Sequence, residues 1–239
     1  MEDYSTLASL ALKQIKSSPG LLKEFQSLAL KNKKGTIRYK DALSFSEKVG
    51  TEASKIIARL VEDGSTLELE AFAEQFIAPV YTSLQNTTIA VSKNVQQTLN
   101  EQNGLALNVA NVKSDKSRIR HIVARYREAE SFDTVSFLLG EDVIQNITRS
   151  AVDDNLRGNA DLQSNAGFDV TITRSDGSGC CDWCASKVGT YKRGEEPKDF
   201  WAVHKNCSCS FEYSSKMRGL YNKITFSTDS TGKMAKNTI

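Results

Sequence analysis

Apolar side chains recur at three- and four-residue spacing along most of the chain up to about residue 151. This spacing is typical of amphipathic helices, because it places the apolar residues on one face. The runs end at glycine-, proline- or polar-rich breaks such as "SSPG" (17–20) and "EDGST" (62–66). The pattern predicts helical segments over residues 7–15, 21–29, 42–60, 69–95, 119–126 and 137–151. We expect these apolar faces to form the core of a helical body.

The stripe over residues 69–95 contains two features that disturb a regular helix. Pro79 cannot donate a backbone hydrogen bond, so the segment is either one helix of about 30 residues or two helices broken near Pro79. Thr87 and Thr88 interrupt the apolar stripe, and we expect only partial burial at these positions.

The character of the sequence changes near residue 165. Phe168, Val170 and Ile172 alternate with polar residues, which predicts a strand, and "GTYKRG" (189–194) and "CSCSFEY" (207–213) predict two more. Beyond Tyr213 the apolar residues are isolated, which indicates a mobile or extended tail. The predicted fold class is α+β: a helical domain (1–164), a small β-rich zinc-binding module (165–213) and a basic extended tail (214–239).

Composition and the N-terminal sequence indicate the compartment in which we expect the protein to fold. The chain has 239 residues, 39% hydrophobic and 25% charged, which is typical of globular proteins. No run approaches the roughly 18 apolar residues that a membrane span needs, so we expect no membrane span. The N-terminus lacks the basic and apolar regions of a secretory signal. We therefore expect synthesis in a reducing cytoplasm, where clustered cysteines more often bind metal than form disulfides.

Positive charge is concentrated in residues 113–127 and after Ser214, although the formal net charge is only +2. Such runs are most often solvated helix faces or soluble tails, and we expect His121 to be a surface residue. The alternative is contact with a nucleic acid backbone. The candidate residues for that contact are Lys116, Arg118, Arg120 and Arg125.

All five cysteines lie within residues 180–209, together with one of the two histidines. Cys181 and Cys184 form a C-x2-C pair, and His204 and Cys207 follow as H-x2-C, with Cys209 two residues later. This set can supply the four ligands of a tetrahedral structural zinc site. Cys207 and Cys209 compete for the last position, because alternate residues of a strand face the same side. Cys180, next to Cys181, is interpreted as a spectator.

Other interpretations of the cluster are weaker. Buried thiols would not require all five cysteines in one segment, and a redox C-x2-C pair would need a βαβ context that the sequence lacks. A catalytic zinc ion would need an open coordination position and a nearby carboxylate base. We expect Trp183 and Trp201 to pack beside the metal as a miniature core.

The stretch "CDWCASKVGTY … FWAVHKNCSC" resembles the C-terminal signature of tailed-phage minor head proteins of the phage Mu F-like head-morphogenesis type. The matching positions are Cys181, Cys184, Gly189, Tyr191, His204, Asn206, Cys207 and Cys209. Members usually have Pro and Arg where this chain has Lys205 and Ser208. The motif covers about 30 residues, and the order of helices, strand and motif is also similar to that family.

The resemblance implies a structural protein of the virion, located in the head interior or at the portal vertex, with portal protein and major capsid protein as partners and contact with viral DNA. It implies no enzymatic activity. One rival is a phage-carried nuclease or toxin-like enzyme that would use Arg174, His204 or the basic segment around Arg120. The other is a nucleic-acid-binding zinc protein of the host.

Overall fold

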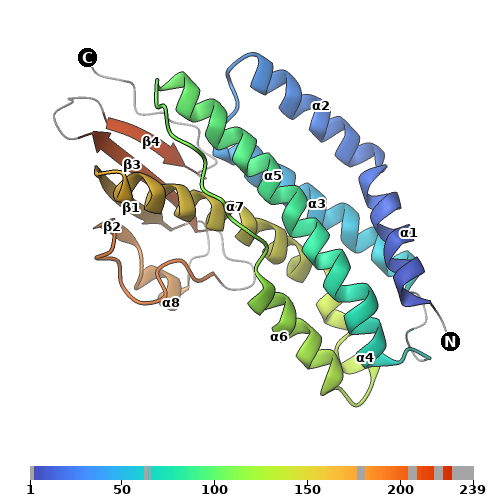
Figure 1. The fold of residues 1–239 in the computed structure, drawn as a ribbon. Helices are drawn as coiled ribbons and strands as arrows, with labels where there is room; N and C mark the ends of the chain where they lie inside the picture. The colour runs from blue at the N-terminus through green and yellow to red at the C-terminus, as the bar shows by residue number, and fades with distance from the viewer. Residues whose placement is uncertain are drawn as a thin grey trace. The chain divides into compact units, whose positions relative to one another are not determined.

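The computed structural model describes residues 3–61, 64, 66–176, 181–203, 209–217 and 223–227. Most of this chain is helical, and the C-terminal part contributes a four-stranded antiparallel sheet (Figure 1). The α+β class is therefore confirmed, whereas the zinc-bound state of the C-terminal module stays a prediction. In the described part of the chain, no helix is both long enough and apolar enough to span a bilayer.

The main helices follow the predicted stripes. They are α1 (Tyr4–Lys16), α2 (Pro19–Lys33), α3 (Tyr39–Leu60), α6 (Lys116–Arg127) and α7 (Glu141–Asn165). Asp3 and Asp115 begin α1 and α6 by accepting hydrogen bonds from backbone N–H groups of the first turn. Pro19 opens α2, a position where its missing N–H leaves no partner unsatisfied.

The segment around Pro79 stays helical but changes its winding. It consists of α4 (Leu69–Phe72), a π-helical turn η1 (Ala73–Ile77) and α5 (Ala78–Gln102). The wide turn ends just before Pro79, where a regular α-helix would lack one backbone hydrogen bond. Neither of the two predicted alternatives is fully correct, because the helical path is continuous but contains a π-turn.

Two predictions of burial need correction. Thr88 is completely buried, because its hydroxyl donates to the carbonyl of Leu84 one turn earlier and so needs no water. Phe137, expected on an apolar core stripe, is 51% exposed. It lies in the 3-10 turn η3 (Ser136–Leu139) before α7, where Arg125 covers its ring. The short 3-10 turn η2 (Phe132–Thr134) precedes η3.

The chain divides into two compact units, each assembled from separate segments. The first unit contains Met1–Leu30, Ser44–Ala90 and Lys113–Ala151. Phe72 lies in its core, with its ring stacked on Phe76 at 4.9 Å between centroids. The rings of Tyr4 and Tyr126 pack edge-on against Phe72 at 5.7 and 5.8 Å. Aromatic residues from α1, α4, η1 and α6 thus hold this unit together.

The second unit contains Lys31–Leu43, Val91–Val112 and Val152–Ile239, and it holds the sheet. The strands are β1 (Phe168–Ser175), β2 (Gly189–Lys192), β3 (Ser210–Met217) and β4 (Lys223–Ser227), in the order β2-β1-β3-β4. The helix α8 (Asp182–Ala185) lies between β1 and β2 in the chain.

The predicted strand positions are confirmed for β1, β2 and β3, and the core of the sheet follows the predicted alternation. Phe168, Val170 and Ile172 are buried, and the ring of Tyr213 on β3 stacks on Phe226 of β4 at 4.4 Å. The tail prediction needs correction, because β3 continues past Tyr213 to Met217 and β4 pairs with it. Residues 228–239 of that tail lie outside the described part of the chain.

Polar side chains fill part of the core of the second unit. The hydroxyl of Tyr39 donates to Gln96 Oε1 at 2.6 Å and lies 3.0 Å from Asn155 Oδ1. Gln163 donates to the hydroxyl of Tyr213 at 3.0 Å, and that hydroxyl lies 3.3 Å from the same Gln96 oxygen. All five residues are buried. Side chains of α5 and α7 are therefore joined to the sheet through a hydrogen-bonded network.

We predict that Tyr39→Phe lowers the free energy of unfolding by about 1–3 kcal/mol, because it removes a buried donor from Gln96 and Asn155. Tyr191→Phe is the matched control, since the Tyr191 hydroxyl is only part-buried and its nearest acceptor lies 3.5 Å away. Urea titrations of both variants measure the difference. Equal stability of the two variants would show that the network contributes nothing measurable.

Candidate metal centre

The C-x2-C pair lies on a single short turn. Cys181 precedes α8, and Cys184 is its third residue. The carbonyl of Cys181 accepts from the Ala185 amide at 2.8 Å, and the carbonyl of Cys184 accepts from the Lys187 amide at 2.9 Å. Cys184 is completely buried, whereas Cys181 is exposed. The backbone of this turn is thus fixed around one buried and one exposed sulfur.

Cys209 reaches the same place from a distant part of the sequence. It precedes β3 and is 1% exposed, and it forms a buried cluster with Cys184, against which Val203 packs. The strand pairing of β3 with β1 brings this end of β3 toward the turn that follows β1. Two of the predicted ligands, separated by 24 intervening residues, therefore share one buried environment.

Of the other predicted ligands, His204 and Cys207 lie outside the described residues, as does Cys180. Within the part of the chain that the structure describes, no three His, Cys, Asp or Glu side chains are gathered as a metal site. The exposed Cys181 therefore does not join Cys184 and Cys209 in such a group. The chemistry of the described sulfurs still fits a soft metal, because two cysteines are buried together and one of them accepts a hydrogen bond from an arginine.

That arginine, Arg174 on β1, is a site residue that pattern reading did not assign to the metal centre. It continues the alternation of Phe168, Val170 and Ile172 and is completely buried. Its guanidinium donates to the carbonyls of Phe200 at 2.5 Å and Ala202 at 2.8 Å, and to Cys184 Sγ at 3.1 Å. A charged residue in the apolar phase of a strand was the signal available in the sequence.

The two tryptophans of this region differ in their packing, and their predicted place beside a metal ion stays a prediction. The Trp201 ring lies 5.0 Å from that of Phe211 and 5.2 Å from that of Phe200. Trp183 is instead 44% exposed, with the Lys187 ammonium 3.8 Å from its ring centroid. In α8 the buried residue is Cys184, which follows Trp183 directly in the chain.

Gly189 lies opposite Arg174 in the pairing of β1 with β2. Its φ of +149° is a backbone conformation that residues with a side chain rarely adopt. An added Cβ would also lie 2.9 Å from the hydroxyl of Tyr191. Glycine is thus required where β2 begins, directly across from the buried arginine.

The loop between β2 and the Phe200–Trp201 pair is fixed by a second arginine. Arg193 forms ion pairs with Asp161 of α7 and with Glu196. Its backbone amide donates to the carbonyl of Val170 at 2.9 Å, and the Gly194 amide donates to Glu196 Oε2 at 2.6 Å. These bonds attach the loop to β1 and α7, upstream of the segment that leads to His204.

The ionisation of Glu196 reflects this environment. Burial alone would raise its pKa, but the backbone N–H groups of Glu196 and Gly194 and the charge of Arg193 together hold the pKa below its usual value.

The candidate DNA-binding residues lie on α6 in the first unit. Arg118 faces Asp115 at 3.6 Å, Arg120 donates to the carbonyl of Lys116, and Arg125 lies over the Phe137 ring. His121 is exposed, as predicted. These contacts hold part of the basic face in place but leave Lys116, Arg120 and Arg125 accessible to solvent.

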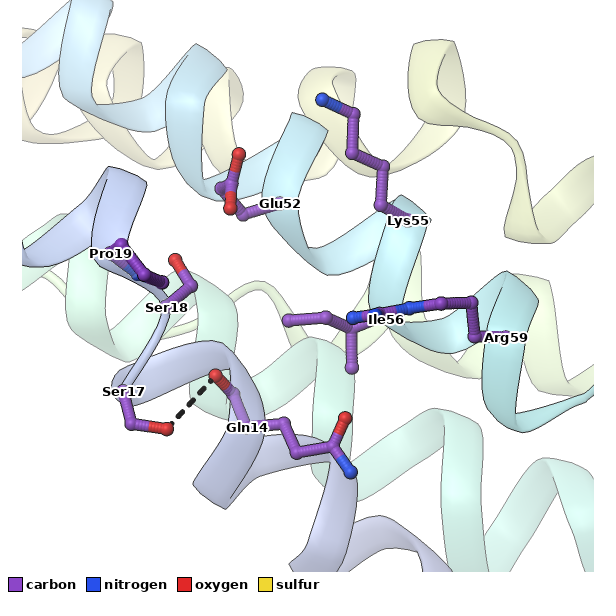
Figure 2. A pocket seen from close by; sticks show the side chains of 8 residues that line it. All are labelled: Gln14, Ser17, Ser18, Pro19, Glu52, Lys55, Ile56 and Arg59. Carbon is purple, nitrogen blue, oxygen red and sulfur yellow. Dashed lines mark hydrogen bonds between the residues drawn. The ribbon is translucent and has the colours of Figure 1, made fainter.

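A separate cavity of about 660 Å³ opens in the first unit between the α1–α2 junction and α3. Figure 2 shows that Ser17 donates to the Gln14 carbonyl at its rim, while Glu52, Lys55 and Arg59 approach from α3. The lining contains both charge signs and no cysteine or histidine.

With this geometry described, we compared the chain with known proteins. It matches no protein-family model, no curated protein and no solved structure.

We predict that Glu196→Gln lowers stability by about 1 kcal/mol at pH 7, because the charge-assisted bonds to Arg193 and Gly194 are lost. A carboxyl whose pKa is depressed on folding stabilises above its unfolded pKa of about 4.3, and this contribution disappears as pH falls through the folded value. The difference from the native protein should therefore shrink as pH falls below the unfolded pKa and vanish once the folded carboxyl is protonated. Thermal unfolding across this range measures it.

Glu195→Gln is the matched control, because Glu195 is exposed and its substitution makes the same change in charge. Both variants keep every candidate zinc ligand, so losses caused by ligand protonation cancel in the comparison. An equal effect of the two substitutions would argue against the ion pair.

Proposed function

We propose that this chain is a structural minor head protein of a tailed bacteriophage, with a C-terminal module held by one structural zinc ion. The proposal rests on the C-x2-C and H-x-N-C-x-C motifs and their resemblance to the phage Mu F-like head-morphogenesis family. One structural observation supports it most directly: Cys184 and Cys209 are buried in one cluster although they are distant in sequence.

We assign the ligands as Cys181, Cys184, His204 and Cys209. The sequence alone leaves Cys207 and Cys209 equivalent, and the burial of Cys209 beside Cys184 favours Cys209. Such a set closes a tetrahedral site, so its role is to stabilise the fold. Because these ligands would meet only in the folded module, metal binding would contribute directly to the free energy of folding.

The helical part is the proposed docking body for portal protein and major capsid protein. The helix α2 supports this role, because only Leu21 and Leu28 are buried while Leu22, Phe25 and Leu30 are 38–53% exposed. Exposed apolar side chains grouped on one helix favour a protein partner. The protein would be made in the host cytoplasm and reside in the virion, with Lys116, Arg118, Arg120 and Arg125 available for weak contact with packaged DNA.

Purified full-length protein should contain about one zinc ion per chain by metal analysis. Cys184→Ser and Cys209→Ser should lose the ion, because each removes a thiolate ligand. Cys207→Ser and Cys180→Ser are matched controls that should retain it.

Two results would count against these assignments. A structural metal would be excluded if the native protein contains no zinc and its nuclear magnetic resonance spectrum still shows a folded C-terminal module. Loss of zinc in Cys207→Ser but not in Cys209→Ser would show that Cys207, and not Cys209, is the fourth ligand.

Co-expression with the portal and major capsid subunits of the encoding phage should yield a complex that survives purification. The double variant Leu22→Glu/Leu30→Glu should reduce recovery of the complex at least tenfold, because it introduces charge into an apolar contact. Lys23→Glu, an exposed position on the same helix, is the control. Absence of any complex with the native chain would contradict the docking role.

A further inference from the structure

Arg174 joins three separate segments of the second unit through one planar group. Its guanidinium, carried by β1, donates to Cys184 of α8 and to the carbonyls of Phe200 and Ala202. The ring centroids of Phe211 and Trp183 lie 5.4 and 5.9 Å from its Cζ atom. A guanidinium has five donors in a fixed fork, and this geometry suits several acceptors at set angles.

The sulfur contact is the informative one. A neutral thiol is a weak acceptor, whereas a metal-bound cysteine carries thiolate charge and accepts a strong, charge-assisted hydrogen bond. The 3.1 Å contact is short for sulfur. Burying a guanidinium is costly unless it meets compensating negative charge, and a metal-bound thiolate at Cys184 would supply such charge.

Zn²⁺ with three thiolates and one neutral imidazole would have a net charge of −1, and the guanidinium beside Cys184 is of the opposite sign. We propose that Arg174 is an outer-shell positioning residue of the zinc centre, which donates to the Cys184 thiolate and holds its sulfur in place. This inference rests on the structural zinc ion proposed above.

The hydrogen bonds from Arg174 to the carbonyls of Phe200 and Ala202 also hold the backbone that precedes His204 in the chain. Ala202 lies two residues before His204, and Phe200 four residues before it. Arg174 therefore fixes the sulfur of one ligand and the backbone that approaches another. Metal ligands supported in this way are held closer to their bound geometry before the ion arrives.

The test compares zinc affinity by chelator competition in full-length protein. Arg174→Met should weaken binding about 10- to 100-fold, the range typical of outer-shell substitutions. Arg174→Lys keeps the charge but loses the fork, and should fall between this variant and the native protein. Arg157→Met is the matched control and should stay within about twofold of the native protein, since Arg157 lies 5.9 Å from the Trp201 ring and is exposed.

A second measurement separates this role from ordinary packing. Cobalt-substituted protein should show a shifted sulfur-to-cobalt charge-transfer band in Arg174→Lys, because the hydrogen bond to the thiolate is altered. Thermal unfolding of Arg174→Met, with and without zinc, should show a larger loss in the zinc-bound form. Should Arg174→Met fail to fold, the affinity and cobalt spectrum of Arg174→Lys decide the question.

The outcomes distinguish the two proposals. Native protein that binds no zinc overturns both. Native protein that binds zinc, with unchanged affinity and an unchanged cobalt spectrum in the Arg174 variants, overturns the role of Arg174 and leaves the zinc centre intact. Equal destabilisation with and without metal, at unchanged affinity, would show that Arg174 serves packing only.

Discussion

The buried guanidinium of Arg174 is the interaction on which the C-terminal part of the structure depends. It occupies a position in the apolar phase of β1, and its N–H groups donate to one sulfur and two carbonyls on other segments of the chain. Three hydrogen bonds from its terminal N–H groups offset the burial of this arginine, and they limit where those segments can lie. A small sheet with irregular connections obtains its order from such constraints more than from core volume.

A comparable principle operates along the two long helices. Buried polar residues recur on α5 at Gln85, Thr88, Ser92, Gln96 and Asn100, and on α7 at Thr148, Asn155, Asn159 and Gln163. In the first unit Thr148 donates to the carbonyl of Ser46, and in the second Asn159 accepts from the amide of Ala110. Directional bonds of this kind favour one helix register over others that apolar contacts would tolerate equally.

Hydrophobic periodicity was sufficient to predict the helices, the first strand and the α+β class, because each depends on local spacing. It failed where a polar group is satisfied by a distant partner or by its own backbone. Thr88 interrupts the stripe yet is buried through the Leu84 carbonyl, and β4 is short and gains order by pairing with β3. Within the candidate site, cysteine spacing selected Cys184 and Cys209 as candidate ligands, but their shared burial and the contact of Cys184 with Arg174 are visible only in the tertiary structure.

The π-helical turn before Pro79 has a consequence for everything downstream on α5. One residue added to a turn rotates the following helix by about 100° relative to an uninterrupted α-helix. The face that begins with Phe72 and Phe76 would, without η1, continue into different positions of α5. Removing one residue from Ala73–Ile77 would therefore turn both Gln85 and Gln96 away from their partners on other segments. The π-helical turn therefore sets the rotation of α5 about its axis, and with it the side of the helix that faces the core.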